Sequence, residues 1–398
     1  MEQGLKTQTV FNFVILGPIF VVFSLFLSRW HDGHQQDFAA YWQAGRMILT
    51  GQNVYDSAQW IAVRQSEGIL PYAEPTFQYP LPLGILFSPL ALFPIQSAYT
   101  LWMFCAQIAV LACIAILLEF YPERSGYFEL LTITGVFFFR PMFSILHSGQ
   151  ILTLLLLLLS ISIRLFHNHN WFFGGFILSM LSLKPSLGFP VLILSGLWLL
   201  SRTQWKGIWG MISGGFVLIF IGALVNYKWI VDYIKIGGNF LHKYYGIHPT
   251  LWGVVDKIFK IDRLSLTIGF VCVASVLVVE AYLFWRNKSD LAAFPAFATI
   301  LPAALLIAPY AWNYDQILLT VPIVFILIAI SIKHGNGKAA LFMLGIVMLA
   351  FGMVAIAYLV GHDVWSFLNS FVVWMVSLYF VTKSVNFNMD RNTLHVSL

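Results

Sequence analysis

The sequence predicts an all-α protein that crosses a membrane many times. Of its 398 residues, 59% are hydrophobic and only 10% are charged, and the mean hydropathy is +0.81. Soluble domains are about 45–50% apolar and about 25% charged, so this composition excludes a soluble fold. Runs such as ILTLLLLLLSISI at 151–163 are apolar on every face, whereas the strands of a membrane barrel alternate apolar and polar residues. A bundle of transmembrane helices is therefore expected.

Segments apolar enough to span a bilayer recur along the whole chain, each close to the roughly 17–25 residues that cross the hydrocarbon core. The first is interpreted as a retained span, because SRWHD follows it instead of a small-residue cleavage site. The segments that meet near 146–150 and 183–186 are short and closely spaced, which is typical of broken or re-entrant helices. About ten to twelve spans are expected, near residues 10–29, 97–118, 127–146, 150–166, 171–183, 186–200, 207–225, 265–285, 292–308, 316–332, 339–359 and 365–382.

Basic residues in the short loops predict the orientation of these spans. If the N-terminus is cytoplasmic, every short inner loop carries at least one Lys or Arg, as the positive-inside rule requires. Two long loops, about 30–96 and 226–264, then face outward, and residues 386–398 form a cytoplasmic tail. No linker or internal repeat divides the chain, so residues 1–385 are expected to form a single transmembrane domain. The formal net charge of +5 is explained by this topology, and nothing indicates nucleic-acid binding.

The first outer loop begins with a polar and aromatic segment, HDGHQQDFAAYWQAGRMILTG at residues 31–51. From Asp37 onward its large apolar residues recur at helical spacing, which predicts an amphipathic helix at the membrane interface. Two interpretations of Asp37 remain open: it caps this helix, or its carboxylate takes part in chemistry. Asp56 is expected to cap the next short helix. His31 and His34 have a spacing that a metal site could use, but without a further ligand a solvated loop is favoured.

Several polar residues lie where spans are expected to end on the outer face. Ionisable residues at membrane depth are costly and are usually functional. Arg140 and Lys184, each followed by proline, require an anionic partner such as a carboxylate, a lipid headgroup or a bound phosphate, although a lone base at a span end often snorkels to the surface. Asp315, in PYAWNYDQ, can act as a base, orient substrate hydroxyls or cap the following helix. The members of this outer-face set are Asp37, His147, Gln150, Lys184, His242, Asp315 and Asp363.

Motifs of other enzyme classes are missing from the sequence. It has no Gly-rich phosphate loop, no HExxH or DxD pattern and no recognisable Ser/His/Asp arrangement, so neither a nucleotide donor nor a bound metal nor another cofactor is expected. The three cysteines lie in apolar runs without a CxxC pair and are interpreted as packing residues.

Five segments, in this order, resemble glycosyltransferase family 87: DFAAYWQAGRMILTGQNVYD, FQYPLPLGILFSPLALFP, HSGQILTLLLLLL, LKPSLGFPVLIL and APYAWNYDQILLTVP. The resemblance covers roughly residues 10–330 and extends to a group that includes mycobacterial phosphatidylinositol-mannoside mannosyltransferases. It implies a GT-C fold with an extracytoplasmic active site, a polyprenyl-phosphate-linked sugar donor, and inverting transfer without a bound metal. In such enzymes an aspartate of the first outer loop is the general base, and Asp37 is the matching position. Some members carry a histidine in the segment where this chain has Asn313, Tyr314 and Asp315, and proline is common at the position of Val54.

The resemblance therefore implies a membrane hexosyltransferase that moves a hexose or pentose, mannose-like, from a polyprenyl phosphate to a lipid or glycan acceptor. The expected location is a bacterial cytoplasmic membrane, with the active site facing outward and membrane lipids as partners. Transfer requires deprotonation of the acceptor hydroxyl, alignment at C1 and stabilisation of the departing phosphate. Asp37 is assigned to the first task, and Lys184 and Arg140 with His147 to the last. The expected substrate contacts are Tyr41, Trp42, Tyr79, Gln150, Trp312, Asn313, Tyr314 and Asp315.

Two rival functions are less compatible with the sequence. A transporter or flippase of polar lipids should carry polar residues near the bilayer midplane and often shows repeated halves, whereas here these residues gather toward one face. A polymerase or ligase of the O-antigen type usually has one dominant late loop, whereas the largest loop of this chain comes early.

Overall fold

A computed structural model describes residues 37–69, 76–122, 124–244, 248–260, 262–288 and 291–383, together with residues 19, 22, 23, 25 and 26. Most of the expected first span, His31, His34 and the tail at 386–398 lie outside these residues. The described part of the chain forms α-helices and 3-10 helices without a strand, which confirms the all-α prediction.

Long apolar helices confirm a polytopic membrane protein. Every span expected between residues 97 and 382 coincides with one helix or with two consecutive helices of the structure. By length and composition, six helical segments within the described residues are able to cross a membrane. They are α5 (Ile95–Leu118), α11 (Trp205–Val225), α14 (Asp262–Arg286), the segment of η4 (Asn313–Leu319) and α16 (Thr320–His334), α17 (Asn336–Val360), and the segment of η5 (Val364–Ser366) and α18 (Phe367–Lys383).

The number of full-length spans in the described residues is smaller than the ten to twelve expected. A seventh arises if α6 (Gly126–Phe138) and α7 (Arg140–Ser148), which are bent by 55° relative to each other, count as one. The other apolar helices have 10–17 residues, and at about 1.5 Å per residue even 17 residues fall short of a hydrocarbon core of about 30 Å. These shorter helices are α8 (Leu152–His167), α9 (Trp171–Leu178) with η3 (Ser179–Leu183), α10 (Pro185–Ser201) and α15 (Ala293–Ile307).

Both breaks expected from the sequence are present. Helix α7 ends at Ser148 and α8 begins at Leu152, and the connection contains Gly149 at a φ of 69°. Only Lys184 separates η3 from α10, and Pro185 is the first residue of α10, where its missing N–H is of no consequence. Polar side chains therefore interrupt apolar segments at two places where the backbone leaves the helix.

The chain divides into two compact units. Unit 1 comprises Met1–Ala112, Phe143–Leu157 and Val217–Phe240, and unit 2 comprises Cys113–Met142, Leu158–Phe216 and Leu241–Leu398.

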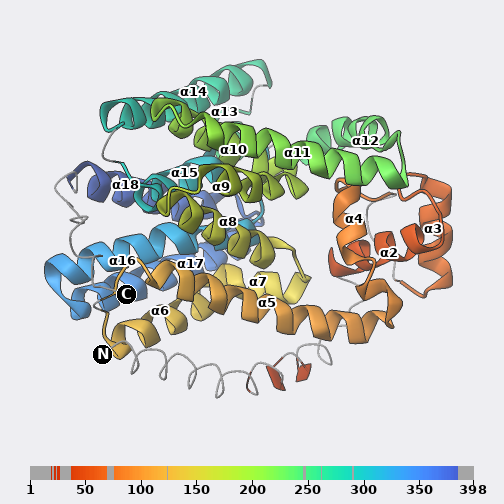
Figure 1. The fold of residues 1–398 in the computed structure, drawn as a ribbon, viewed down its shortest axis with the longest axis horizontal. Helices are drawn as coiled ribbons and strands as arrows, with labels where there is room; N and C mark the ends of the chain where they lie inside the picture. The colour runs from red at the N-terminus through yellow and green to blue at the C-terminus, as the bar shows by residue number, and fades with distance from the viewer. Residues whose placement is uncertain are drawn as a thin grey trace. The chain divides into compact units, whose positions relative to one another are not determined.

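Unit 1 is built around α2 (Asp37–Leu49), which lies against three short elements of the first long loop (Figure 1). Gly45 of α2 approaches the backbone of Phe87 so closely that an added Cβ would lie 2.9 Å from its carbonyl, so a side chain has no room there. Asp56 caps the next helix as expected, because its Oδ1 accepts the Gln59 N–H at 3.0 Å. The three elements are α3 (Ser57–Ser66), α4 (Leu81–Phe87) and η2 (Leu90–Leu92).

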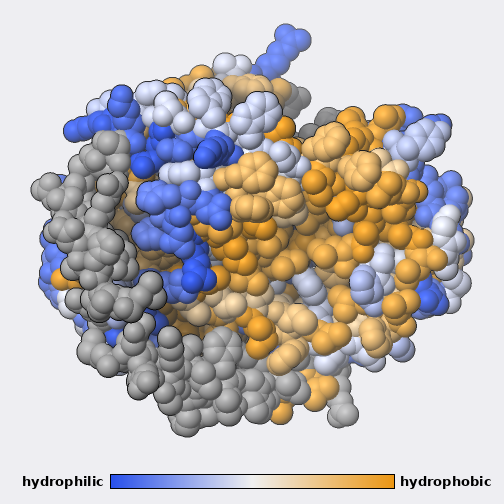
Figure 2. All heavy atoms as spheres, viewed as in Figure 1, coloured by the Kyte–Doolittle hydropathy of each residue, from blue (hydrophilic) through white to orange (hydrophobic). Residues whose placement is uncertain are grey.

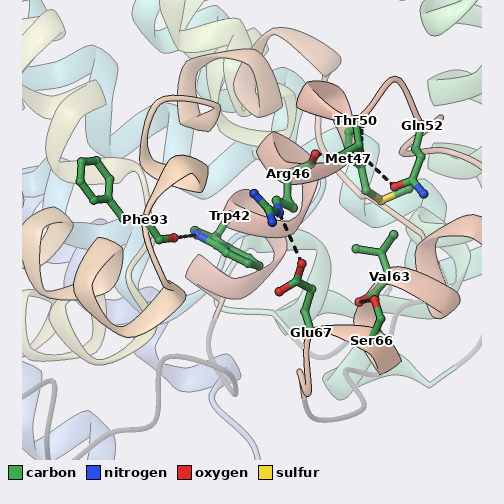
Figure 3. A network of polar contacts seen from close by, with 9 residues as sticks. All are labelled: Trp42, Arg46, Met47, Thr50, Gln52, Val63, Ser66, Glu67 and Phe93. Carbon is green, nitrogen blue, oxygen red and sulfur yellow. Dashed lines mark hydrogen bonds and ion pairs between the residues drawn. The ribbon is translucent and has the colours of Figure 1, made fainter.

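Side-chain contacts tie α2 to its neighbours. Arg46 Nε lies 3.3 Å from Glu67 Oε1 at the end of α3, and the Trp42 indole N–H donates to the Phe93 carbonyl at 3.0 Å (Figure 3). In the interior of the unit, Gln43 accepts from Arg64 at 3.0 Å and donates to the Trp60 carbonyl at 2.7 Å. The first long loop is thus a packed helical layer rather than an irregular loop.

Unit 2 contains the most deeply buried helix, α15, whose residues are nearly all buried. Helices α10, α14, α16 and α18 pack around it. In α17, by contrast, only 28% of the residues in its apolar 18-residue stretch are buried, as expected for a helix that faces lipid. The second long loop forms α12 (Trp229–Tyr244), most of which belongs to unit 1, and α13 (Leu251–Phe259), which belongs to unit 2. Hydrophobic residues cover much of the visible surface of the molecule (Figure 2), which agrees with a membrane environment.

Candidate functional site

The first polar cluster lies within unit 1 and is centred on Gln150. Its amide Nε2 donates to Asp37 Oδ2 at 2.6 Å and lies 3.4 Å from the Tyr79 hydroxyl, while its Oε1 accepts from the Tyr41 hydroxyl at 2.7 Å. Asp37 and Tyr41 are one turn apart on α2, whereas Gln150 follows α7, more than 100 positions along the chain. The structure thus brings together four residues that the sequence predicts for the site.

Burial separates these four residues into two groups. Gln150 and Tyr41 are completely buried, whereas Asp37 and Tyr79 are half-buried. A hydrogen bond to an ionised carboxylate is shorter and stronger than a neutral one, particularly away from water. The cluster can therefore hold the Asp37 carboxylate in one orientation at a surface that a substrate is able to reach.

The backbone that carries Gln150 is held in place by α5. The Tyr99 hydroxyl donates to the Leu146 carbonyl at 2.9 Å, and the Trp102 indole donates to the Gly149 carbonyl at 2.9 Å. Gly149 itself has a positive φ, and a Cβ there would lie 2.6 Å from Cβ of Phe38, the residue that follows Asp37. A glycine is required at this position by both its dihedral angle and its neighbour.

Two further predicted residues of unit 1 have other surroundings. Trp42 is only 4% exposed, and its indole N–H is directed at the Phe93 carbonyl (Figure 3). His147 is exposed near the end of α7, and its backbone carbonyl accepts from Tyr99 at 3.1 Å. In this structure Trp42 is a packing residue of the first loop, and its predicted sugar contact stays a prediction.

The second polar cluster lies within unit 2 and contains Lys184 and Asp315. The Lys184 ammonium donates to Asp315 Oδ1, and both residues are almost completely buried. The same ammonium lies 4.6 Å from the centre of the Tyr314 ring, a distance at which a cation–π attraction operates. The anionic partner that a buried lysine requires is thus a carboxylate of the protein itself.

Asp315 has a second role that the sequence also allowed. Its Oδ2 accepts the backbone N–H of Trp312 at 2.7 Å, so the carboxylate caps the start of η4 while it pairs with Lys184. Each oxygen of this carboxylate therefore has a partner, as burial of a charge demands.

The family to which the chain belongs follows from the comparison of its sequence with models of protein families. The family model of glycosyltransferase family 87 matches residues 77–309. The chain belongs to glycosyltransferase family 87. A search of curated proteins finds no match to it. The resemblance inferred from the five segments is thereby confirmed, and the protein is a membrane glycosyltransferase.

In this glycosyltransferase, Gln150 and Lys184 lie inside the matched region, whereas Asp37 precedes it and Asp315 follows it closely. The two clusters therefore combine residues of the matched region with residues just outside it.

His248 is a residue of the second cluster that the sequence analysis did not single out. Its ring meets the Trp312 ring edge to face with centroids 4.6 Å apart, and it is 1% exposed. Burial and, to a smaller extent, the charge of Lys184 lower the pKa of His248 to about 4, although a hydrogen bond with the Ala311 backbone raises it. The imidazole is therefore neutral at physiological pH. Its proximity to this cluster is set by packing, and the sequence IHPTLW contains no signal for it.

Arg140 of this glycosyltransferase also has a carboxylate neighbour within unit 2. Burial raises the pKa of Asp363, whereas hydrogen bonds from Ser366 and Asn313 and the charge of Arg140 lower it. Two of the predicted residues thus interact with the Asp363 carboxylate: Asn313 by a hydrogen bond and Arg140 by its charge. Among the described residues, no group of three or more His, Cys, Asp or Glu side chains is placed to hold a metal ion.

Proposed function

We propose that this family 87 enzyme transfers a hexose or pentose, mannose-like, from a polyprenyl-phosphate donor to a hydroxyl group of a lipid or glycan acceptor. In this proposal the reaction takes place on the extracytoplasmic face of a bacterial cytoplasmic membrane and inverts the configuration at C1. The observation that carries the proposal is the half-buried Asp37 carboxylate, which is held by the buried amide of Gln150.

The proposed chemistry needs one base and a good leaving group. Asp37 takes the proton of the acceptor hydroxyl as its oxygen attacks C1 of the sugar, and the C1–O bond to the phosphate breaks. The electron pair of that bond leaves with the polyprenyl phosphate, which is already an anionic leaving group. A single oriented carboxylate is sufficient for this proton transfer, because no further activation of the donor is required.

The predicted cations for the phosphate are Lys184 and Arg140, each beside a carboxylate in unit 2. An ammonium group has three N–H donors. A lysine that donates one hydrogen bond to a carboxylate oxygen keeps two N–H groups, which can donate to phosphate oxygens. Because the neighbouring carboxylate offsets the positive charge, such a cation would bind phosphate mainly through directional hydrogen bonds. Lys184, Arg140 and His147 therefore stay proposed phosphate ligands, and the aromatic residues Tyr79, Trp312 and Tyr314 stay proposed sugar contacts.

The test of this proposal uses two aspartates at helix starts in unit 1: Asp37, the first residue of α2, and Asp56, the cap of α3. Asparagine caps a helix about as well as aspartate but does not accept a proton at neutral pH. Asp37→Asn should therefore reduce sugar transfer from radiolabelled polyprenyl-phosphate mannose by at least about 100-fold, whereas Asp56→Asn, the matched cap variant, should transfer at the wild-type rate. Full activity of a folded Asp37→Asn protein would contradict the assignment of the base.

The same transfer assay, carried out in membranes that contain the protein, distinguishes an enzyme from a lipid transporter. Formation of a glycosidic product, with the anomeric configuration opposite to that of the donor by NMR, is the expected result. Translocation of the intact donor without any glycosidic product would refute the proposed reaction.

A further inference from the structure

The hydrogen atoms of the Gln150 amide determine how this residue is oriented. A carboxylate accepts hydrogen bonds but donates none, so the group 2.6 Å from Asp37 Oδ2 has to be the NH2 of the amide. The carbonyl Oε1 then faces Tyr41, whose hydroxyl donates to it at 2.7 Å. In the flipped amide, two oxygen atoms with no hydrogen between them would face each other at the carboxylate.

Tyr41 supports this orientation, because its hydroxyl donates to the amide oxygen that faces away from the carboxylate. Its hydroxyl sits on a completely buried ring that packs against Tyr79 and Phe87, with centroids 5.0 Å and 4.9 Å away. The ring is fixed by these contacts, and the direction of its O–H follows from the acceptor it faces.

We propose that Gln150 is a positioning residue that holds the Asp37 carboxylate in one rotamer, and that Tyr41 supports Gln150 in its donating orientation. This inference rests on the proposed role of Asp37 as the base. Gln150 was predicted to contact substrate, but complete burial and its protein partners give it this different role.

The positioning role follows from burial as well as from distance. A charge-assisted hydrogen bond is short and directional, so the bond from Gln150 restricts the rotation of the Asp37 carboxylate. An aspartate has two torsions, and a base acts only if its lone pair points at the proton it removes. The backbone next to Gln150 is itself fixed, because Trp102 of α5 donates to the Gly149 carbonyl and Gly149 lies against Phe38.

The decisive variant is Gln150→Glu, which has the same shape as the wild type. Two carboxyl groups at hydrogen-bond distance share one proton, so the base stays protonated to a higher pH. The acid limb of the kcat/KM profile is expected to move up by about one pH unit or more. A side chain at position 150 that does not contact the base would leave the profile where it is.

Two further variants test the hydrogen bonds from Tyr41 to Gln150 and from Gln150 to Asp37, with a buried glutamine of α5 as the control. Gln150→Leu is expected to lower kcat about 10-fold to 100-fold with little change in KM, and Tyr41→Phe to lower it less. Gln107 is also completely buried, and it donates to the Met103 carbonyl of its own helix at 3.0 Å. Gln107→Leu should keep the wild-type kcat and pH profile.

The outcomes separate this inference from the proposed function. If Asp37→Asn is inactive, a wild-type pH profile for Gln150→Glu, or a kcat of Gln150→Leu equal to that of Gln107→Leu, overturns the positioning role alone. If Asp37→Asn is active, the assignment of the base is wrong and the positioning role with it. Should Gln150→Leu fail to fold, the pH profile of the isosteric Gln150→Glu protein still decides.

Discussion

Replacing Lys184 by methionine should destabilise the protein more than replacing Lys184 and Asp315 together. The two side chains are 5% and 0% exposed, and they form a direct ion pair. Removal of one partner of a buried pair leaves an uncompensated charge and typically costs about 3–5 kcal/mol, whereas replacement of both partners by neutral groups is often close to neutral. Asparagine at 315 still offers an oxygen to the Trp312 N–H, so the cap of η4 is retained in the double variant.

Thermal unfolding in detergent, followed by tryptophan fluorescence, measures this difference. All variants are heated at the same rate, because the unfolding of such proteins is often irreversible. Lys184→Met and Asp315→Asn should each lower the apparent Tm by several degrees, and the double variant should regain at least about half of the loss. The exposed pair Arg164–Glu119, whose side chains are about 50% exposed, is the control, and its removal should cost at most about 1 kcal/mol.

Strictly additive effects of the two single variants would refute the reasoning, because they would mean that the pair is not coupled. Sugar transfer by the double variant answers a second question. If it is as stable as the wild type but inactive, Lys184 acts on the substrate as well as on Asp315. If it is stable and active, the pair has a structural role only, and the proposed contact of Lys184 with the phosphate is wrong.

Three further predictions follow from the contacts of single residues. Gly149→Ala should lower both Tm and sugar transfer, and by more than Gly51→Ala, which has the same positive φ but nothing within 4 Å of an added Cβ. Glu280→Gln should unfold like the wild type because an amide keeps the oxygen that accepts the Trp374 indole N–H at 2.7 Å, whereas Glu280→Leu should cost about 1–3 kcal/mol by leaving that buried donor without a partner. His248, with a pKa lowered to about 4, should make stability fall as the pH drops from about 6.5 toward 4. Between these pH values the unfolded chain binds a proton that the folded chain does not. The free energy of unfolding, measured by denaturation at several pH values, should therefore fall by up to about 3 kcal/mol in the wild type and by less in His248→Gln.

Much of the fold could be predicted because lipid imposes one rule on every span. A backbone inside a bilayer has to satisfy its hydrogen bonds within the helix, so apolar segments of sufficient length form helices whatever their neighbours are. The breaks at Gly149 and Lys184 were also predictable, since glycine, proline and charged residues interrupt apolar runs there. The number of full-length spans was not, because segments such as α8, with 16 residues, and α15, with 15 residues, are apolar but shorter than a span.

The candidate site was predictable residue by residue but not in its pairings. Four of its residues can be recognised in the sequence because they are polar and lie at the ends of apolar segments: Asp37, Gln150, Lys184 and Asp315. Which of them meet depends on the packing of helices that are far apart in the sequence, with 113 positions between Asp37 and Gln150 and 131 between Lys184 and Asp315. His248 reaches its place beside Trp312 in the same way.

The sequence by itself determined that this chain is a helical membrane protein, and its ordered segments identified glycosyltransferase family 87. Composition and local pattern are sufficient for both, because they depend on residues that are close along the chain. Only the tertiary structure decided that a buried glutamine orients Asp37 and that Lys184 pairs with Asp315. The physical reason is that a buried polar group has to find its partner wherever the packed helices place one, and sequence distance carries no information about that place.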